Sequence, residues 1–128
     1  DEPTRQRLLK STPMLGNELL QYGLSDQARE TLSLFKLLVR VIRSQGVERI
    51  GGHVISMTHY PSDLLAVLWF WRWAWKATPG DADKPLVHLP IVPLFETIDD
   101  LERGPAILAE LLAIPEYRDY LRRSTERE

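Results

Sequence analysis

Apolar residues follow a helical period between positions 25 and 46 of the chain. They recur at alternating spacings of four and three: Ala28, Leu32, Phe35, Val39 and Ile42. Basic residues occupy the opposite side, so this stretch predicts a long amphipathic helix with one buried face. Ser25 is a suitable N-cap and Gly46 a suitable terminator. Prolines and glycines interrupt residues 1–24, which predict an irregular lead-in with a short helix.

Two short runs rich in β-branched residues predict strands. The first run covers residues 51–58 and begins with a glycine pair, and the second covers residues 89–95. A helix start follows each run. The Pro-Ser-Asp sequence at 61–63 follows the first, and Asp99, with Glu102 completing a capping box, follows the second. The order strand, helix, strand, helix predicts two consecutive β/α units with parallel strands.

The helix predicted at 64–76 carries four tryptophans at alternate positions, a spacing that also suits a strand. Its length and the apolar residues that lead into it favour a helix. Its uninterrupted apolar run is far shorter than the roughly twenty residues that a membrane span needs. Further along, the Gly-Pro pair at 104–105 predicts an interruption before a helix at 106–113. Pro115 then starts a last helix that runs to about Arg123.

The composition fits one ordinary globular domain, with 128 residues of which 44% are hydrophobic and 27% charged. The net charge of -2 gives no electrostatic reason to expect nucleic acid or an anionic membrane as a partner. The chain has no cysteine, which excludes disulfides and thiol nucleophiles and fits a reducing cytosol. It starts with Asp1 instead of Met, which suggests a processed product or a piece of a longer chain.

Two parallel strands are too few for a complete α/β domain. Parallel sheets are nearly always covered on both faces, and a full β/α barrel needs about 250 residues. The sequence is therefore expected to be an excerpt from a larger α/β enzyme. In such enzymes the chemistry lies at the carboxyl ends of the strands, which draws attention to Glu96 at the end of the second strand.

Several sequence blocks carry a family resemblance: His53-Val-Ile-Ser-Met-Thr, Pro61-Ser-Asp-Leu-Leu-Ala-Val, Val92-Pro-Leu-Phe-Glu-Thr with Asp99-Asp-Leu, and Pro115-Glu-Tyr-Arg. In this order they resemble the central part of bacterial-type phosphoenolpyruvate carboxylase, from about Leu24 to Tyr120. The resemblance implies a helix-rich α/β fold with two consecutive β/α units of a TIM-type (β/α)8 barrel, preceded by the long amphipathic helix. Residues 25–128 would then be a fragment of the barrel domain, and residues 1–24 its lead-in.

The resemblance also implies a function. Enzymes of this family are large, cytoplasmic and usually homotetrameric lyases. They carboxylate phosphoenolpyruvate with bicarbonate to give oxaloacetate and phosphate, an anaplerotic carbon fixation that feeds the tricarboxylic acid cycle. They use Mg or Mn and no biotin. This chain is accordingly expected to be part of such an enzyme, without a nucleic acid or membrane partner.

Two residues match functional positions of the family. Glu96 matches its metal-binding glutamate, and Leu94 matches a substrate-binding position on the apolar wall of the site. A carboxylate at the end of a barrel strand faces the active-site mouth, where a hard cation takes one or two protein carboxylates. The resemblance places a catalytic histidine and an arginine upstream, and a second metal-binding aspartate, a lysine and a Gly/Arg-rich loop downstream. No catalytic residue is therefore assigned within this chain, which alone is expected to be inactive and to bind Mg weakly if at all.

The other polar candidates have structural explanations. The histidines share no metal-ligand spacing and are expected to be structural or surface residues: His53, His59 and His88. Asp99 and Asp100 are expected to be helix-start residues. The alternative function is a non-catalytic α/β interaction module, derived from the same enzyme, that docks a partner through an exposed tryptophan-rich helix at 69–75.

Overall fold

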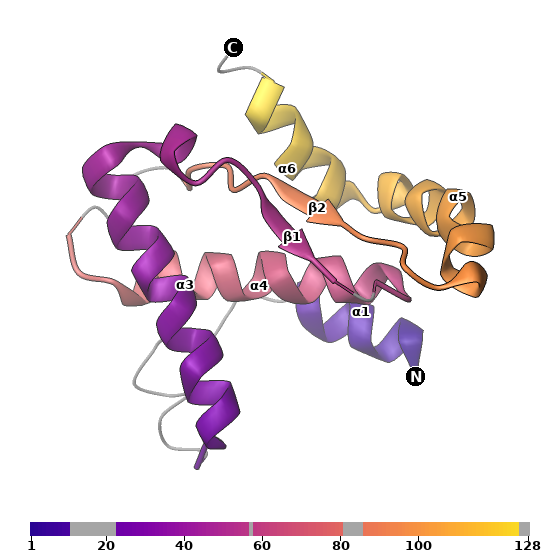
Figure 1. Ribbon diagram of the computed structural model, residues 1–128, viewed down its shortest axis with the longest axis horizontal. Helices are drawn as coiled ribbons and strands as arrows, with labels where there is room; N and C mark the ends of the chain where they lie inside the picture. The colour runs from indigo at the N-terminus through magenta and orange to yellow at the C-terminus, as the bar shows by residue number, and fades with distance from the viewer. Residues whose placement is uncertain (11–22, 57, 81–85, 126–128) are drawn as a thin grey trace. The chain divides into compact units, whose positions relative to one another are not determined.

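The computed structural model describes residues 1–10, 23–56, 58–80 and 86–125. Its elements in chain order are α1 (Glu2–Lys10), α3 (Asp26–Gln45), the 3-10 helix η1 (Val47–Arg49), β1 (His53–Ile55), α4 (Pro61–Ala77), β2 (Ile91–Pro93), α5 (Ile98–Ala113) and α6 (Pro115–Thr125) (Figure 1). The fold is therefore helix-rich α/β, as the sequence predicts. Most of the predicted lead-in, residues 11–22, lies outside the described residues.

These elements form two compact units. Unit 1 consists of the described parts of Asp1–Ser11, Gly52–Val67 and His88–Glu128, and unit 2 of those of Thr12–Gly51 and Leu68–Val87. Unit 1 contains both strands. Within the part of the chain that the structure describes, no helix has both the length and the apolar character to cross a membrane.

The strands β1 and β2 run side by side in the same direction (Figure 1), which confirms the predicted parallel pairing. Their register joins His53 to Ile91, Val54 to Val92 and Ile55 to Pro93. The ladder is shorter than the two predicted strands. Hydrogen bonds nevertheless continue past its end, where Leu94 N donates to Ile55 O (2.8 Å) and Thr58 N donates to Leu94 O (3.0 Å).

Helices cover one face of this sheet. Their buried side chains form the core of unit 1: Leu64, Leu65, Ile107, Leu111, Ile114 and Tyr117. Ile55, Ile91 and Phe95 pack against this cluster from the strand side. The residues that alternate with them are exposed: Val54 (55%), Val92 (43%) and Leu94 (41%). We call the side of the sheet that carries these three side chains the open face.

Tyr120 of α6 holds the chain just before β2. Its hydroxyl accepts a hydrogen bond from Leu89 N and donates one to Leu89 O, both at 2.6 Å. Tyr120 is 7% exposed and Leu89 is fully buried, and this burial raises the pKa of the Tyr120 hydroxyl. A single phenol thus satisfies two buried backbone groups that have no partner in the short ladder.

The N-cap of α5 lies two residues earlier than the sequence predicts. Thr97 is its N-cap, with an extended backbone and a side chain that accepts the N–H of Asp100 at 3.0 Å. The predicted cap at Asp99 is therefore wrong. Both residues are of types that favour this position, so the tertiary structure decides between them.

The predicted interruption of this helix is also wrong, because α5 runs through Pro105. Proline removes one hydrogen bond from the middle of a helix. The ring of Phe95 lies beside the preceding residue, since a Cβ at Gly104 would be in van der Waals contact with it at 3.4 Å. Burial of Ile107 and Leu111 further along the same side of the helix stabilises the continuous form.

In unit 2, the prediction for the first long helix is confirmed. Ser25 Oγ accepts the N–H of Ala28, and Gly46 ends α3 with a φ of 91° and an N–H bonded to Ile42 O. The buried residues of α3 are those of the predicted stripe: Leu32, Phe35, Val39 and Ile42.

The tryptophan-rich stretch is helical, as predicted, but it lacks the exposure that the alternative function requires. Trp71, Trp73 and Trp75 are at most 4% exposed. Phe70 stacks on Phe35 of α3 with ring centroids 5.7 Å apart, and Trp71 Nε1 donates to the carbonyl of residue 87 at 2.8 Å. These aromatic residues bury one another against α3, so they offer no docking surface and do not favour the interaction module.

Candidate functional site

The segment after β2 carries the two residues that the sequence analysis singles out. Along it, Phe95 packs against the core, whereas Leu94 and Glu96 on either side are exposed. Because successive side chains of an extended chain point to opposite sides, Leu94 and Glu96 share the side of the open face. The hydrogen bonds of Leu94 to Ile55 and Thr58 fix this segment at the end of β1.

A histidine and an aspartate that were expected to have separate structural roles form a pair beside this segment. His59 Nδ1 lies 2.8 Å from Oδ1 and 2.7 Å from Oδ2 of Asp100. The Asp100 side chain is 1% exposed and that of His59 is 38% exposed. Arg103 Nη2 also donates to Asp100 Oδ1 at 3.1 Å. Asp100 is a helix-start residue, as predicted, but it is also a buried carboxylate with two side-chain donors, His59 and Arg103.

The sequence does contain a signal for this pair. His59 follows β1, and Asp100 lies in the first turn of the helix that follows β2. The carboxyl ends of adjacent parallel strands lie at the same edge of a sheet, so residues just beyond them can meet. Spacing along the chain, which is 41 positions for this pair, cannot show it.

The environment of Asp100 stabilises its ionised form. The hydrogen bond from His59 is the main cause that lowers the pKa of Asp100 below its ordinary value. Burial acts in the opposite direction, while Thr97 and the positive charges of His59 and Arg103 add to the lowering. The carboxylate therefore keeps its negative charge at the pH values at which cells work.

The lowered pKa of Asp100 predicts an acid-sensitive contribution to stability. The unfolded chain takes up the proton first, at about pH 4, so the contribution is complete above that pH and disappears as the pH falls through the lower folded-state pKa. We expect the difference in free energy of unfolding between wild type and Asp100→Asn to shrink below about pH 4. Urea denaturation across pH would measure it, and a difference that grows on acidification would contradict the assignment.

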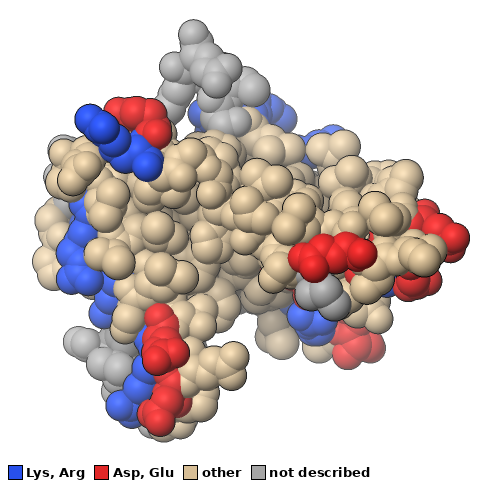
Figure 2. Space-filling view, viewed as in Figure 1, with Lys and Arg blue, Asp and Glu red and all other residues tan. Residues whose placement is uncertain are grey.

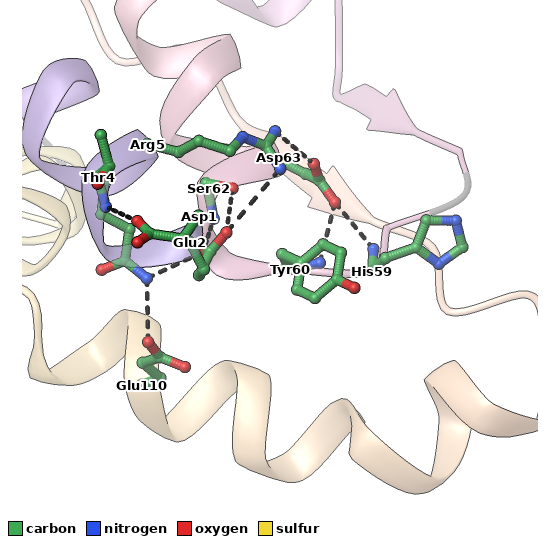
Figure 3. Close-up of polar contacts among 10 residues, drawn as sticks. Asp1, Glu2, Thr4, Arg5, His59, Tyr60, Ser62, Asp63 and Glu110 are labelled. Atoms are coloured by element: carbon green, nitrogen blue, oxygen red, sulfur yellow. Dashed lines mark hydrogen bonds and ion pairs between the residues drawn. The ribbon is translucent and has the colours of Figure 1, made fainter.

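Acidic side chains also fix the start of α4 (Figure 3). The carboxylate of Glu2 accepts hydrogen bonds from Ser62 N (3.0 Å) and Ser62 Oγ (2.7 Å). Asp63 Oδ2 accepts from the backbone N–H groups of His59 and Tyr60, both at 2.9 Å. These bonds satisfy backbone donors that a helix start leaves without partners. They hold the backbone of His59 at the same time as its ring contacts Asp100.

The other histidines have structural environments. His53 lies in β1, and His88 packs against the ring of Tyr120 with centroids 4.5 Å apart. Burial lowers the pKa of both imidazoles. Neutral, partly buried rings of this kind are consistent with the structural role that the sequence analysis expects.

Glu96 is suited to supply one carboxylate ligand of a divalent metal site. Its carboxylate is exposed beside the open face, and Mg²⁺ is usually bound by one or two carboxylates together with water. Among the described residues, no three His, Cys, Asp or Glu side chains lie close enough to hold a metal ion together. A site with three such protein ligands would therefore need at least one from outside these residues.

Charges of both signs occur on the face of the molecule that Figure 2 shows. Figure 2 shows Lys and Arg in small groups near Asp and Glu, with uncharged residues between the groups.

The family model and the relatives compared with this chain carry the same family description. The family model described as phosphoenolpyruvate carboxylase matches residues 1–128. The phosphoenolpyruvate carboxylase of Thermus sp. (strain 71) is 53% identical over 68 residues, which are 53% of this chain and 8% of that protein. That of Methylorubrum extorquens is 41% identical over 116 residues (89% of this chain, 12% of that protein), and that of Chromobacterium violaceum is 37% identical over 125 residues (94% and 14%). The chain spans about a tenth of the length of these curated relatives.

Proposed function

Because the chain belongs to the phosphoenolpyruvate carboxylase family, we propose that it works as part of an enzyme that carboxylates phosphoenolpyruvate with bicarbonate to give oxaloacetate and phosphate. The observation that carries this proposal is the placement of Glu96 and Leu94. Both lie on the exposed side of the chain directly after a parallel strand. Such strand ends are where α/β enzymes hold their substrates.

We further propose that β1 and β2 are two strands of a (β/α)8 barrel, with residues 25–128 in the barrel domain and residues 1–24 leading into it. In such a barrel, helices cover the outer face of each strand, and the inner face lines the barrel interior. The sheet of unit 1 has one face covered by helices and one open face of branched apolar residues. This asymmetry supports the barrel over an isolated two-stranded sheet.

In the proposed mechanism, Glu96 holds the divalent metal, Mg²⁺ or Mn²⁺, through its carboxylate. When bound, this metal would supply a Lewis acid that stabilises negative charge on the substrate. Leu94 provides an apolar wall beside the substrate and limits the access of water, which strengthens electrostatic interactions in the site. The catalytic histidine, the other metal ligand and the arginines would lie elsewhere in the enzyme, so this chain alone would not turn over substrate.

The proposal includes the wider properties of the family that the resemblance implies. The complete enzyme would be a biotin-independent, cytoplasmic homotetramer. No partner other than phosphoenolpyruvate, bicarbonate and the metal is proposed for this segment.

Replacement of Glu96 by glutamine tests the metal assignment. In the complete enzyme that carries this segment, we expect Glu96→Gln to weaken Mn²⁺ binding by about a hundredfold, because even residues that only orient metal ligands contribute about 10- to 100-fold. Equilibrium binding of Mn²⁺ and bicarbonate-dependent release of phosphate from phosphoenolpyruvate would measure the effect. The matched control is Glu102→Gln, which removes an exposed carboxylate from the nearby helix. Wild-type Mn²⁺ affinity in Glu96→Gln would refute the role of Glu96.

A further inference from the structure

We propose that His59 and Asp100 form a positioning pair that holds Glu96 in place for the metal. This inference rests on the proposed function, because it assigns a purpose to the pair only if Glu96 is a metal ligand. Neither residue is proposed to touch substrate or metal. The pair acts by fixing the backbone on which Glu96 lies.

Hydrogen bonds hold the backbone on either side of Glu96. On one side, Leu94 is bonded through both its N–H and its carbonyl to the end of β1, at 2.8 and 3.0 Å. On the other side, Thr97 is the N-cap of α5 and accepts the N–H of Asp100 at 3.0 Å. The position of Glu96 is therefore set by two anchors, the end of β1 and the first turn of α5.

The buried side chain of Asp100 holds the first turn of α5 in place. The carboxylate of Asp100 is buried, and a buried carboxylate is tolerated only when hydrogen-bond donors surround it. His59 and Arg103 are these donors, at 2.7 to 3.1 Å. Arg103 lies on α5 itself, so it cannot fix α5 relative to another element. His59 comes from the loop before α4 and joins that loop to α5.

The backbone of His59 is itself held by a hydrogen bond. Its backbone N–H donates to Asp63 Oδ2 at 2.9 Å, so the loop is held at the start of α4. The ring is thus a link between two anchored elements. Without it, Asp100 would lose a donor that no residue of its own helix replaces, and the first turn of α5 could shift together with Thr97. Metal ligands need orientation to within about 0.5 Å, so a small shift weakens binding.

The ring atom that matters is Nδ1, which allows a conservative replacement. An asparagine at this position can place its side-chain nitrogen close to where Nδ1 lies and donate to the same carboxylate. Alanine cannot. Asp100→Asn tests the link from the other side, because it puts an NH₂ group or a weaker acceptor opposite the two donors.

The experiment measures Mn²⁺ binding without turnover. The complete enzyme is titrated with Mn²⁺ in the absence of substrate, and free Mn²⁺ is followed by electron paramagnetic resonance. We expect His59→Ala and Asp100→Asn to weaken Mn²⁺ binding by about tenfold, as for residues that orient metal ligands. His59→Asn should restore most of the affinity. At saturating Mn²⁺, kcat should fall less than the apparent Mn²⁺ affinity. Asp99→Asn, which removes the exposed neighbouring partner of Arg103, should bind Mn²⁺ like wild type.

The outcomes separate this inference from the proposed function. If Glu96→Gln binds Mn²⁺ like wild type, the metal assignment fails. If Glu96→Gln is weak but His59→Ala and Asp100→Asn bind normally, the positioning pair fails and the metal assignment stands. A folded His59→Asn variant as weak as His59→Ala would also overturn the inference. Thermal unfolding reports whether each variant folds. If His59→Ala does not fold, the Mn²⁺ affinity of Asp100→Asn tests the positioning pair.

Discussion

Replacement of Tyr120 by phenylalanine is expected to lower the free energy of unfolding by about 3 kcal/mol. The substitution removes one oxygen atom and leaves the N–H and the carbonyl of Leu89 without the partner they share. Each unsatisfied buried group costs about 1–3 kcal/mol, and Leu89 is fully buried, so water cannot easily replace the phenol. The ring itself stays, which separates this effect from a loss of packing.

Two measurements would test this expectation. Urea denaturation gives the change in free energy of unfolding, and amide hydrogen exchange should show faster exchange at Leu89. The matched control is Tyr60→Phe, which removes a hydroxyl from a residue that is 46% exposed and should change stability by less than about 0.5 kcal/mol. A loss below about 1 kcal/mol for Tyr120→Phe would mean that the two backbone groups find other partners.

Replacement of Arg43 by methionine is also expected to cost about 3 kcal/mol of stability. The guanidinium of Arg43 donates to the carbonyls of Trp75 (2.8 Å), Thr78 (2.9 Å) and Pro79 (2.9 Å), and it lies 4.5 Å from the centroid of the Trp75 ring. These carbonyls lie at the end of α4, where a helix leaves acceptors without partners and favours positive charge. Methionine keeps most of the apolar stem, so the loss comes mainly from the hydrogen bonds.

Thermal and urea unfolding would measure the loss for Arg43→Met. Arg40→Met is the control, since Arg40 lies on the same helix and is exposed. It removes the same charge without these carbonyl contacts, and its effect should stay within about 0.5 kcal/mol. Equal effects of the two substitutions would show that net charge, and not the capping of α4, explains the result.

The local features of the fold could be predicted from the sequence because short-range physics determines them. The period of apolar residues defines the buried face of α3, and Ser25 and Gly46 define its ends. The connection between β1 and β2 is long enough for a helical crossover, which favours a parallel pair, and the pair is parallel. Periodicity and capping act over a few residues, so a sequence contains them directly.

The features that the sequence analysis missed depend on distant contacts. Pro105 and Gly104 predict a helix break, yet burial of Ile107 and Leu111 favours a continuous helix. The alternative function required an exposed tryptophan-rich helix, yet Trp73 is buried and Lys36 of α3 lies over its ring. In each case, tertiary packing outweighs a local preference that is worth only a few kcal/mol at most.

The same distinction between local features and distant contacts applies to the candidate site. The positions of Leu94 and Glu96 could be predicted, because alternation along an extended chain places both on one side. Their roles remain proposals. The contact between His59 and Asp100 could not be predicted from spacing, because two elements bring the residues together.

The alternation along residues 91–96 has a consequence for sequence variation. Ile91 and Phe95 contact the core, so selection on folding should restrict them to apolar residues of similar size. Val92, Leu94 and Glu96 contribute little to that core. In the proposed barrel the inner face of each strand also packs, so a restriction of Val92 and Leu94 to apolar residues would still report selection on folding. A restriction of Glu96 to carboxylates in a mutational scan would instead report selection on the chemistry of the site.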